Sequence, residues 1–76
     1  MFQFLDFELY SLIGHPVSAI DGYIGTVVDV RQTPDSAIQV QLEADQNFID
    51  LHLYYVDRIS AGHVMLNINK HSIFHL

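Results

Sequence analysis

Five histidines are the side chains of this sequence with the clearest chemical potential, because imidazole binds transition metals and titrates near neutral pH. His71 and His75 are four residues apart, which on a helix would place both rings on one face at the spacing of zinc ligands. No third ligand is close to them in sequence. A metal site is therefore an alternative to the simpler interpretation, in which these histidines are exposed or lie in an interface.

A second group of possible ligands depends on how the strands pair. Asp50 and His52 alternate along one run of residues, and His63 would lie opposite them if its strand were an antiparallel neighbour. Alternation alone does not fix strand register, so this His–His–Asp cluster is a hypothesis. The candidate metal ligands are thus Asp50, His52, His63, His71 and His75. No motif indicates a bound cofactor, and we expect none.

We expect the protein not to be an enzyme. The chain contains no cysteine, which excludes a thiol nucleophile and an internal disulfide. No motif surrounds its serines to activate a hydroxyl, and its glycines do not form a phosphate-binding loop between a strand and a helix. General acid–base catalysis needs a dry cleft, whereas a barrel of this size is filled by its own side chains.

The charge balance argues against nucleic-acid partners. Nine acidic residues outnumber three basic ones, the net charge is −6, and Arg31, Arg58 and Lys70 are scattered along the chain. Binding to a phosphate backbone uses several grouped cations, so an RNA-processing role is disfavoured. No run approaches the roughly 20 apolar residues of a membrane-spanning helix. The apolar N-terminus carries Asp6 and Glu8 but no basic residue, unlike a secretory signal, so we expect a cytoplasmic protein without a membrane span.

The candidate residues must be positioned by short strands. A chain of 76 residues makes one domain, 1–76. Period-two alternation of apolar residues predicts strands that begin near Pro16 and that cover 23–30, 37–44, 48–56 and 63–69. Residues 57–62 are a connection in which one short helical turn at 56–59 is an option. Together these signals predict a mostly β protein, a small barrel of five to six antiparallel strands with a short C-terminal tail.

Five residues are predicted to form turns or corners. The pair Asp21–Gly22 between two apolar runs favours a two-residue hairpin turn, which needs positive φ at both central residues. Gly25, inside the second run, indicates a bulge, a sharp corner or a close backbone approach. Gly14 lies in a corner before the first hairpin, and Gly62 directly precedes the last strand.

The aromatic side chains are too many for so small a core to enclose. Residues 1–10 alternate in two phases, which fits a first core strand with a bulge or an extended arm that packs on the barrel or on a second subunit. Aromatic residues left outside the core would form an apolar interaction surface. The residues expected in this interface are Phe2, Phe4, Phe7, Phe48, Tyr54 and Phe74. We expect a homodimer, an unidentified protein partner, or both.

Two blocks of sequence carry a family resemblance. The first comprises residues 12–17 (LIGHPV), 21–22 (DG) and 24–30 (IGTVVDV). The second comprises 56–59 (VDRI) and 62–67 (GHVMLN), followed by Lys70. Over about residues 10–73 the chain resembles the PRC-barrel domains, a family named for the H subunit of the photosynthetic reaction centre.

The resemblance implies a function of a general kind. PRC-barrel domains occur as free-standing small proteins and as modules of larger ones, they act in protein interaction and assembly, and they share no catalytic residues. Together with the residues above, it leads us to expect a non-enzymatic, self-associating interaction module. The alternative is a small metal- or ligand-binding protein that uses its surface histidines.

Overall fold

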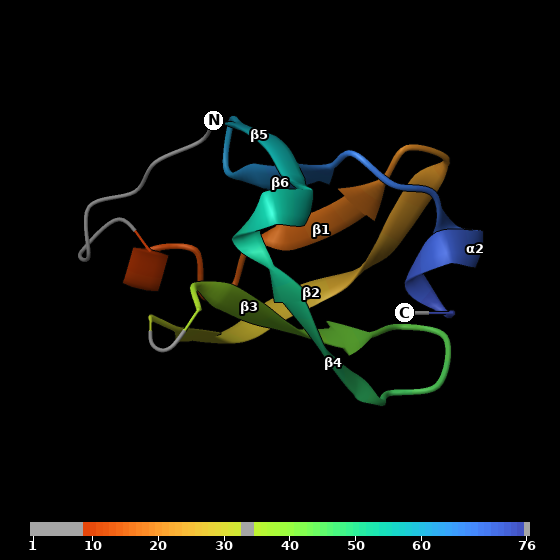
Figure 1. Cartoon of the computed structure of the whole chain (residues 1–76), viewed down its shortest axis with the longest axis horizontal. Coiled ribbons are helices and arrows are strands. Elements are labelled where there is room, and N and C mark those ends of the chain that lie inside the picture. The colour runs from red at the N-terminus through yellow and green to blue at the C-terminus, as the bar shows by residue number, and fades with distance from the viewer. Residues whose placement is uncertain (1–8, 33–34, 76) are drawn as a thin grey trace.

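The computed structural model describes residues 9–32 and 35–75, which form one six-stranded sheet with little helix (Figure 1). The strands are β1 (Pro16–Ala19), β2 (Gly22–Arg31), β3 (Ala37–Leu42), β4 (Phe48–His52), β5 (Val56–Ser60) and β6 (His63–Leu66). A 3₁₀ turn, η1 (Leu53–Tyr55), joins β4 to β5, and the short helix α2 (Lys70–Ile73) follows β6. The mostly β fold class predicted from the sequence is confirmed.

The sheet is mixed, so the prediction of antiparallel strands throughout is wrong at one place. The strand order is β4-β3-β2-β1-β6-β5, and all neighbours are antiparallel except β1 and β6. Val17 of β1 lies opposite Val64 of β6 in the parallel pair. Parallel neighbours need a long connection, and here most of the chain lies between the two strands.

The sheet does not close into the predicted barrel. Following the pairings along the strand order shows that β4 and β5, the two edges, run in the same direction. A closing contact between them would be a parallel pair, which needs a connection of about a dozen residues or more. Only the three residues of η1 join them. The continuous segment 48–60 therefore forms both edges of the sheet in succession, as the segment that crosses the front of Figure 1 shows.

The alternation predicted for β3 is confirmed by its burial pattern. Ile38, Val40 and Leu42 of β3 are buried in the core, while Gln39 and Gln41 alternate with them and are half-buried. The strand ends at Leu42, two residues before the predicted end. Alternation therefore identified the face that packs inward, because successive side chains of a strand point to opposite faces.

The predicted strand over 48–56 is interrupted by η1. Nδ1 of His52 accepts a hydrogen bond from the N–H of Tyr54 at 2.9 Å and so caps the 3₁₀ turn. Val56 then begins β5, so residues 56–60 form a strand where the sequence favoured a connection with an optional helical turn. This capping hydrogen bond stabilises the turn in which the chain passes from the edge beside β3 to the edge beside β6.

The first hairpin turn is shifted by one residue from the prediction. Its two loop residues are Ile20 and Asp21, and Ala19 pairs with Gly22 across it. Positive φ occurs only at Gly22 (φ 140°), not at Asp21. The chain after β6 holds this turn in place, because the carboxylate of Asp21 accepts a hydrogen bond from the N–H of Lys70 at 2.9 Å.

The backbone explains the predictions made for three glycines. A Cβ on Gly25 would collide with the carbonyl of Gln41 on the neighbouring strand, which confirms the close approach expected there. Gly62 (φ 75°) and Ala61 (φ 53°) form the β5–β6 turn with positive φ at both central residues, the geometry that a tight hairpin requires. Gly14 lies in the corner before β1, where its N–H donates to the carbonyl of Val27 at 2.8 Å.

Both ends of the described chain pack on the sheet through short helical segments. Ile73 of α2 is buried in the core, and this packing stabilises a helix that is too short to form by itself. Leu9 is also buried, but Leu9 and Tyr10 are helical, not extended as predicted. Among the described residues, no helix has the length and apolar character needed to cross a membrane.

Candidate interaction surface

The free edge of β4 is a regular strand edge without a bulge. All five of its residues pair with β3 in unbroken register. The N–H of Leu53 donates to Ser36, and the N–H of Leu42 donates to Asn47. Because hydrogen-bonded and non-bonded pairs alternate in an antiparallel ladder, these bonds direct the backbone groups of Phe48, Asp50 and His52 away from β3.

The other edge of the sheet is protected. The register of β5 against β6 shifts between Val56 and Arg58, so Asp57 is bulged out of the ladder. Asp57 and Arg58 are both exposed. Bulges and charged side chains are the usual means by which proteins prevent an edge strand from pairing with another chain. Of the two edges, only β4 is therefore suited to accept a further strand.

The only charged residue of β4 is neutralised by its own chain. Nη1 of Arg31 lies 2.9 Å from Oδ2 of Asp50, and the two side chains are about half exposed. Both side chains line a surface depression formed by β2, β3 and β4. Its lining residues are Asp29, Val30, Arg31, Ala37, Gln39 and Asp50. An ion pair at this position lowers the electrostatic barrier that a lone carboxylate would present to an approaching strand.

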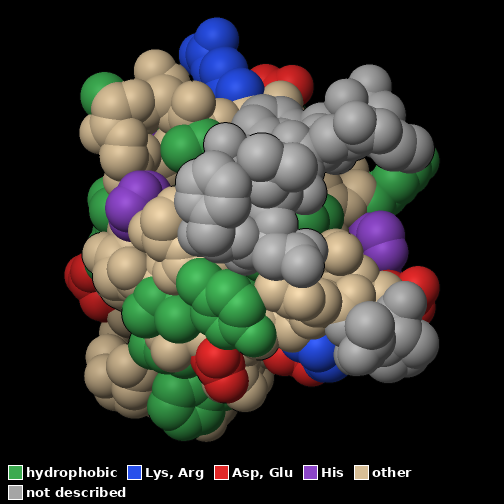
Figure 2. All heavy atoms as spheres, turned by 90° about the vertical axis from the view of Figure 1, so that its left-hand side faces the viewer, with side chains coloured by type: hydrophobic (Ala, Val, Ile, Leu, Met, Phe, Trp, Pro, Cys, Tyr) green, Lys and Arg blue, Asp and Glu red, His purple; other side chains and the backbone are tan. Residues whose placement is uncertain are grey.

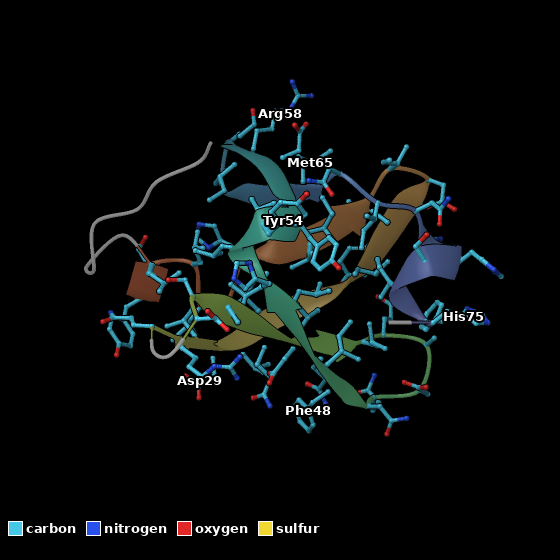
Figure 3. All side chains as sticks on the ribbon, in the orientation of Figure 1. Asp29, Phe48, Tyr54, Arg58, Met65 and His75 are labelled. Atoms are coloured by element: carbon cyan, nitrogen blue, oxygen red, sulfur yellow. The ribbon has the colours of Figure 1, made fainter. Side chains whose placement is uncertain are left out.

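Two of the predicted interface aromatics flank the β4 edge. Phe48, at the start of β4, is 57% exposed, and Tyr54, in η1 just past the end of β4, is 77% exposed. In Figure 3 they lie well apart, Phe48 at the lower margin and Tyr54 near the centre. Phe74, directly after α2, is 51% exposed and comes from a different part of the chain. Phe2, Phe4 and Phe7 lie outside the described residues.

Exposed apolar side chains that sequence reasoning missed lie elsewhere. They are Tyr10, Ile13, Ile20 and Tyr23. Figure 2 shows one face on which hydrophobic side chains gather at the lower left, with an acidic side chain among them. Ile20 is exposed because it occupies the hairpin turn. The sequence placed that turn one residue later, at Asp21–Gly22, and so gave no indication that Ile20 would be exposed.

The structure does not assemble the predicted His–His–Asp cluster. His52 lies on β4 opposite Ala37 of β3, whereas His63 lies on β6, on the far side of β1 and β2 in the strand order. Asp50 bonds to Arg31 instead. Within the described part of the chain, no group of three or more histidine or acidic side chains is arranged to hold a metal ion.

The structure does bring His71 and His75 together. Their ring centroids are 4.3 Å apart, with the planes tilted by 31°. Nδ1 of His75 lies 2.8 Å from the carbonyl oxygen of His71. A carbonyl accepts, so Nδ1 of His75 carries a proton. In a neutral ring this leaves the lone pair on Nε2, the tautomer of many metal-bound histidines.

A hydrogen bond between Ser18 and His63 was not foreseen. Oγ of Ser18, a buried polar residue on β1, lies 2.6 Å from Nε2 of the half-buried His63. Among the described residues, no side chain or carbonyl bonds to the other ring nitrogen of His63, so no third group orients this pair as a catalytic dyad requires. The bond instead links the two parallel strands. Only the parallel pairing, which the sequence did not show, brings these residues together.

No family model matches the chain, and no curated protein matches it with significance.

Proposed function

We propose that the protein is a non-enzymatic interaction module of the PRC-barrel type, which associates with further copies of itself through the free edge of β4. The observation that carries this proposal is the contrast between the two edges. β4 is regular and its one charge is paired, while β5 is bulged and charged. The sequence resemblance to an assembly family supports the same conclusion.

Strand addition is a simple way for such an edge to bind. Main-chain hydrogen bonds supply affinity, and side chains at alternate positions supply specificity. Phe48 and Tyr54 flank the edge and offer exposed aromatic surface of the kind that dominates interface energies. A five-residue strand buries less than a standard interface, so we expect a dissociation constant between about 1 μM and 1 mM.

A proline at position 52 tests this proposal with little disturbance to the fold. His52 has φ −58°, close to the value that proline imposes, and its N–H points away from β3. His52→Pro removes that donor and should give a monomer by sedimentation. His52→Ala is the matched control, because it also loses the cap on η1 but keeps the N–H, and it should still associate. Equal association of both variants would contradict the proposal.

The close pair His71–His75 favours a second candidate function, binding of a transition metal ion. Two imidazoles that face each other, one of them held in the ligating tautomer, would supply two ligands to Zn²⁺ or Ni²⁺. Calorimetric titration of untagged protein with Zn²⁺ should then give a site that His75→Ala abolishes and His52→Ala retains. Binding that survives His75→Ala would contradict this candidate.

A further inference from the structure

We infer that the strand which occupies the β4 edge is β4 of a second copy, paired antiparallel about a two-fold axis that passes beside Asp50. This inference rests on the proposed function and specifies its partner and register. Within the described part of the chain, β4 pairs with β3 alone, and no other strand lies along its opposite edge.

The ladder with β3 restricts the registers that a second β4 can adopt. Only Phe48, Asp50 and His52 direct their N–H and C=O groups outward, so each of them must lie opposite another member of this set. Centring the pair on Asp50 places Phe48 opposite His52 of the second copy, and Asp50 opposite its own equivalent. This register uses the outward backbone groups of all three residues in both chains.

A shift by two residues satisfies fewer groups. It would place Asp50 opposite His52 of the second copy and Phe48 opposite Tyr54. Tyr54 cannot serve as a ladder partner, because its N–H already donates to Nδ1 of His52 and its carbonyl accepts from the side chain of Asn67. The opposite shift leaves His52 without a partner strand, since β4 begins at Phe48.

The charges fit the centred register because of Arg31. Two bare carboxylates directly opposite each other on neighbouring strands repel. Here each Asp50 has a guanidinium nitrogen at 2.9 Å within its own chain, so the centre of the interface carries two ion pairs instead of two lone negative charges. At each end, the ring of Phe48 meets the ring of His52, a cross-strand aromatic pair that stabilises such ladders.

Single-cysteine variants test the register, and the cysteine-free chain gives them no background. Opposed residues in a bonded antiparallel pair have Cα atoms about 5.5 Å apart, within disulfide range. Asp50→Cys should therefore form a covalent dimer under mild oxidation, at least about 10-fold faster than Phe48→Cys, His52→Cys or Asp57→Cys. The double variant Phe48→Cys/His52→Cys should also cross-link, and it provides a second test that keeps Asp50 and its ion pair.

The outcomes separate the register from the proposed function. The register alone would be overturned if the wild-type protein sediments as a dimer but both Asp50→Cys and Phe48→Cys/His52→Cys cross-link slowly. Rapid cross-linking of Asp50→Cys/His52→Cys with none in Asp50→Cys would replace it by the shifted one. A wild-type protein that stays monomeric at every concentration would overturn the proposed function itself.

Discussion

Nη1 of Arg31 donates to Oδ2 of Asp50 at 2.9 Å and so connects β2 to β4 across the intervening strand β3. Both side chains are about half exposed, and exposed pairs of this kind contribute less than about 1 kcal/mol to stability. The ion pair matters more for the edge of the sheet, because it neutralises the only charge on β4.

Arg31→Ala should therefore weaken self-association more clearly than it weakens the fold. Without the guanidinium, two carboxylates face each other in the dimer, and the dissociation constant should rise by about 2- to 5-fold at low salt. Sedimentation equilibrium measures this change. Adding Asp50→Asn to Arg31→Ala should restore association, and a dimer that is unaffected by either variant would contradict this role of the ion pair.

Gly25→Ala should destabilise the protein by about 1–3 kcal/mol, because the new methyl group collides with the backbone carbonyl of Gln41 rather than with a movable side chain. Urea denaturation gives the free energy of unfolding. Gly14→Ala is a useful comparison, since its Cβ meets open space and only its φ of 92° is unfavourable. The free energy of unfolding should fall less in Gly14→Ala than in Gly25→Ala. The reverse order would contradict a collision with the carbonyl of Gln41.

The attachment of α2 to the first hairpin predicts a cost for removing its caps. Oδ1 of Asn69 accepts from the N–H of Ser72 at 2.8 Å, and Asp21 accepts from the N–H of Lys70. Asn69→Ala and Asp21→Ala should each lower the free energy of unfolding by about 1 kcal/mol. Asp21→Asn keeps an acceptor oxygen and should lose less than Asp21→Ala does. Equal losses in those two variants would show that the side-chain bond is not what holds α2.

The bond between Ser18 and His63 predicts a difference between two serines. Ser18→Ala leaves a ring nitrogen of His63 without its partner in a half-buried site, which should cost about 1–2 kcal/mol. Ser60 is exposed on β5, and Ser60→Ala should change the free energy of unfolding by less than about 0.5 kcal/mol. Thermal and urea denaturation of both variants check this, and indistinguishable variants would contradict a stabilising role for the bond.

Local patterns predicted the strands but not the way in which they assemble. Ile38, Val40 and Leu42 alternate so regularly that the buried face of β3 follows from sequence alone. The same rule failed after His52, because the alternation continues through Leu53 and Tyr55 while the chain turns into η1. The capping imidazole was the only signal of that turn, and a histidine within a strand pattern is not distinctive.

The sequence patterns did not predict contacts between residues that lie far apart in the chain. The hairpin turn lies one residue from its predicted place, and Lys70, far along the chain, bonds to Asp21 within it. The parallel pairing of β1 with β6 placed His63 beside Ser18 rather than beside Asp50. Of the candidate interface residues, Phe48, Tyr54 and Phe74 are exposed. The relation of Phe48 and Tyr54 to a free strand edge required the strand order.

Pairing of β4 with a second copy can be tested by amide hydrogen exchange, measured by NMR at several protein concentrations. We expect the amides of Phe48, Asp50 and His52 to become more protected as concentration rises, with or without a chelator. The amides of Asp57 and Arg58 on the bulged edge should not change. Protection of these three β4 amides that is independent of concentration would contradict this pairing, as would a change confined to β5.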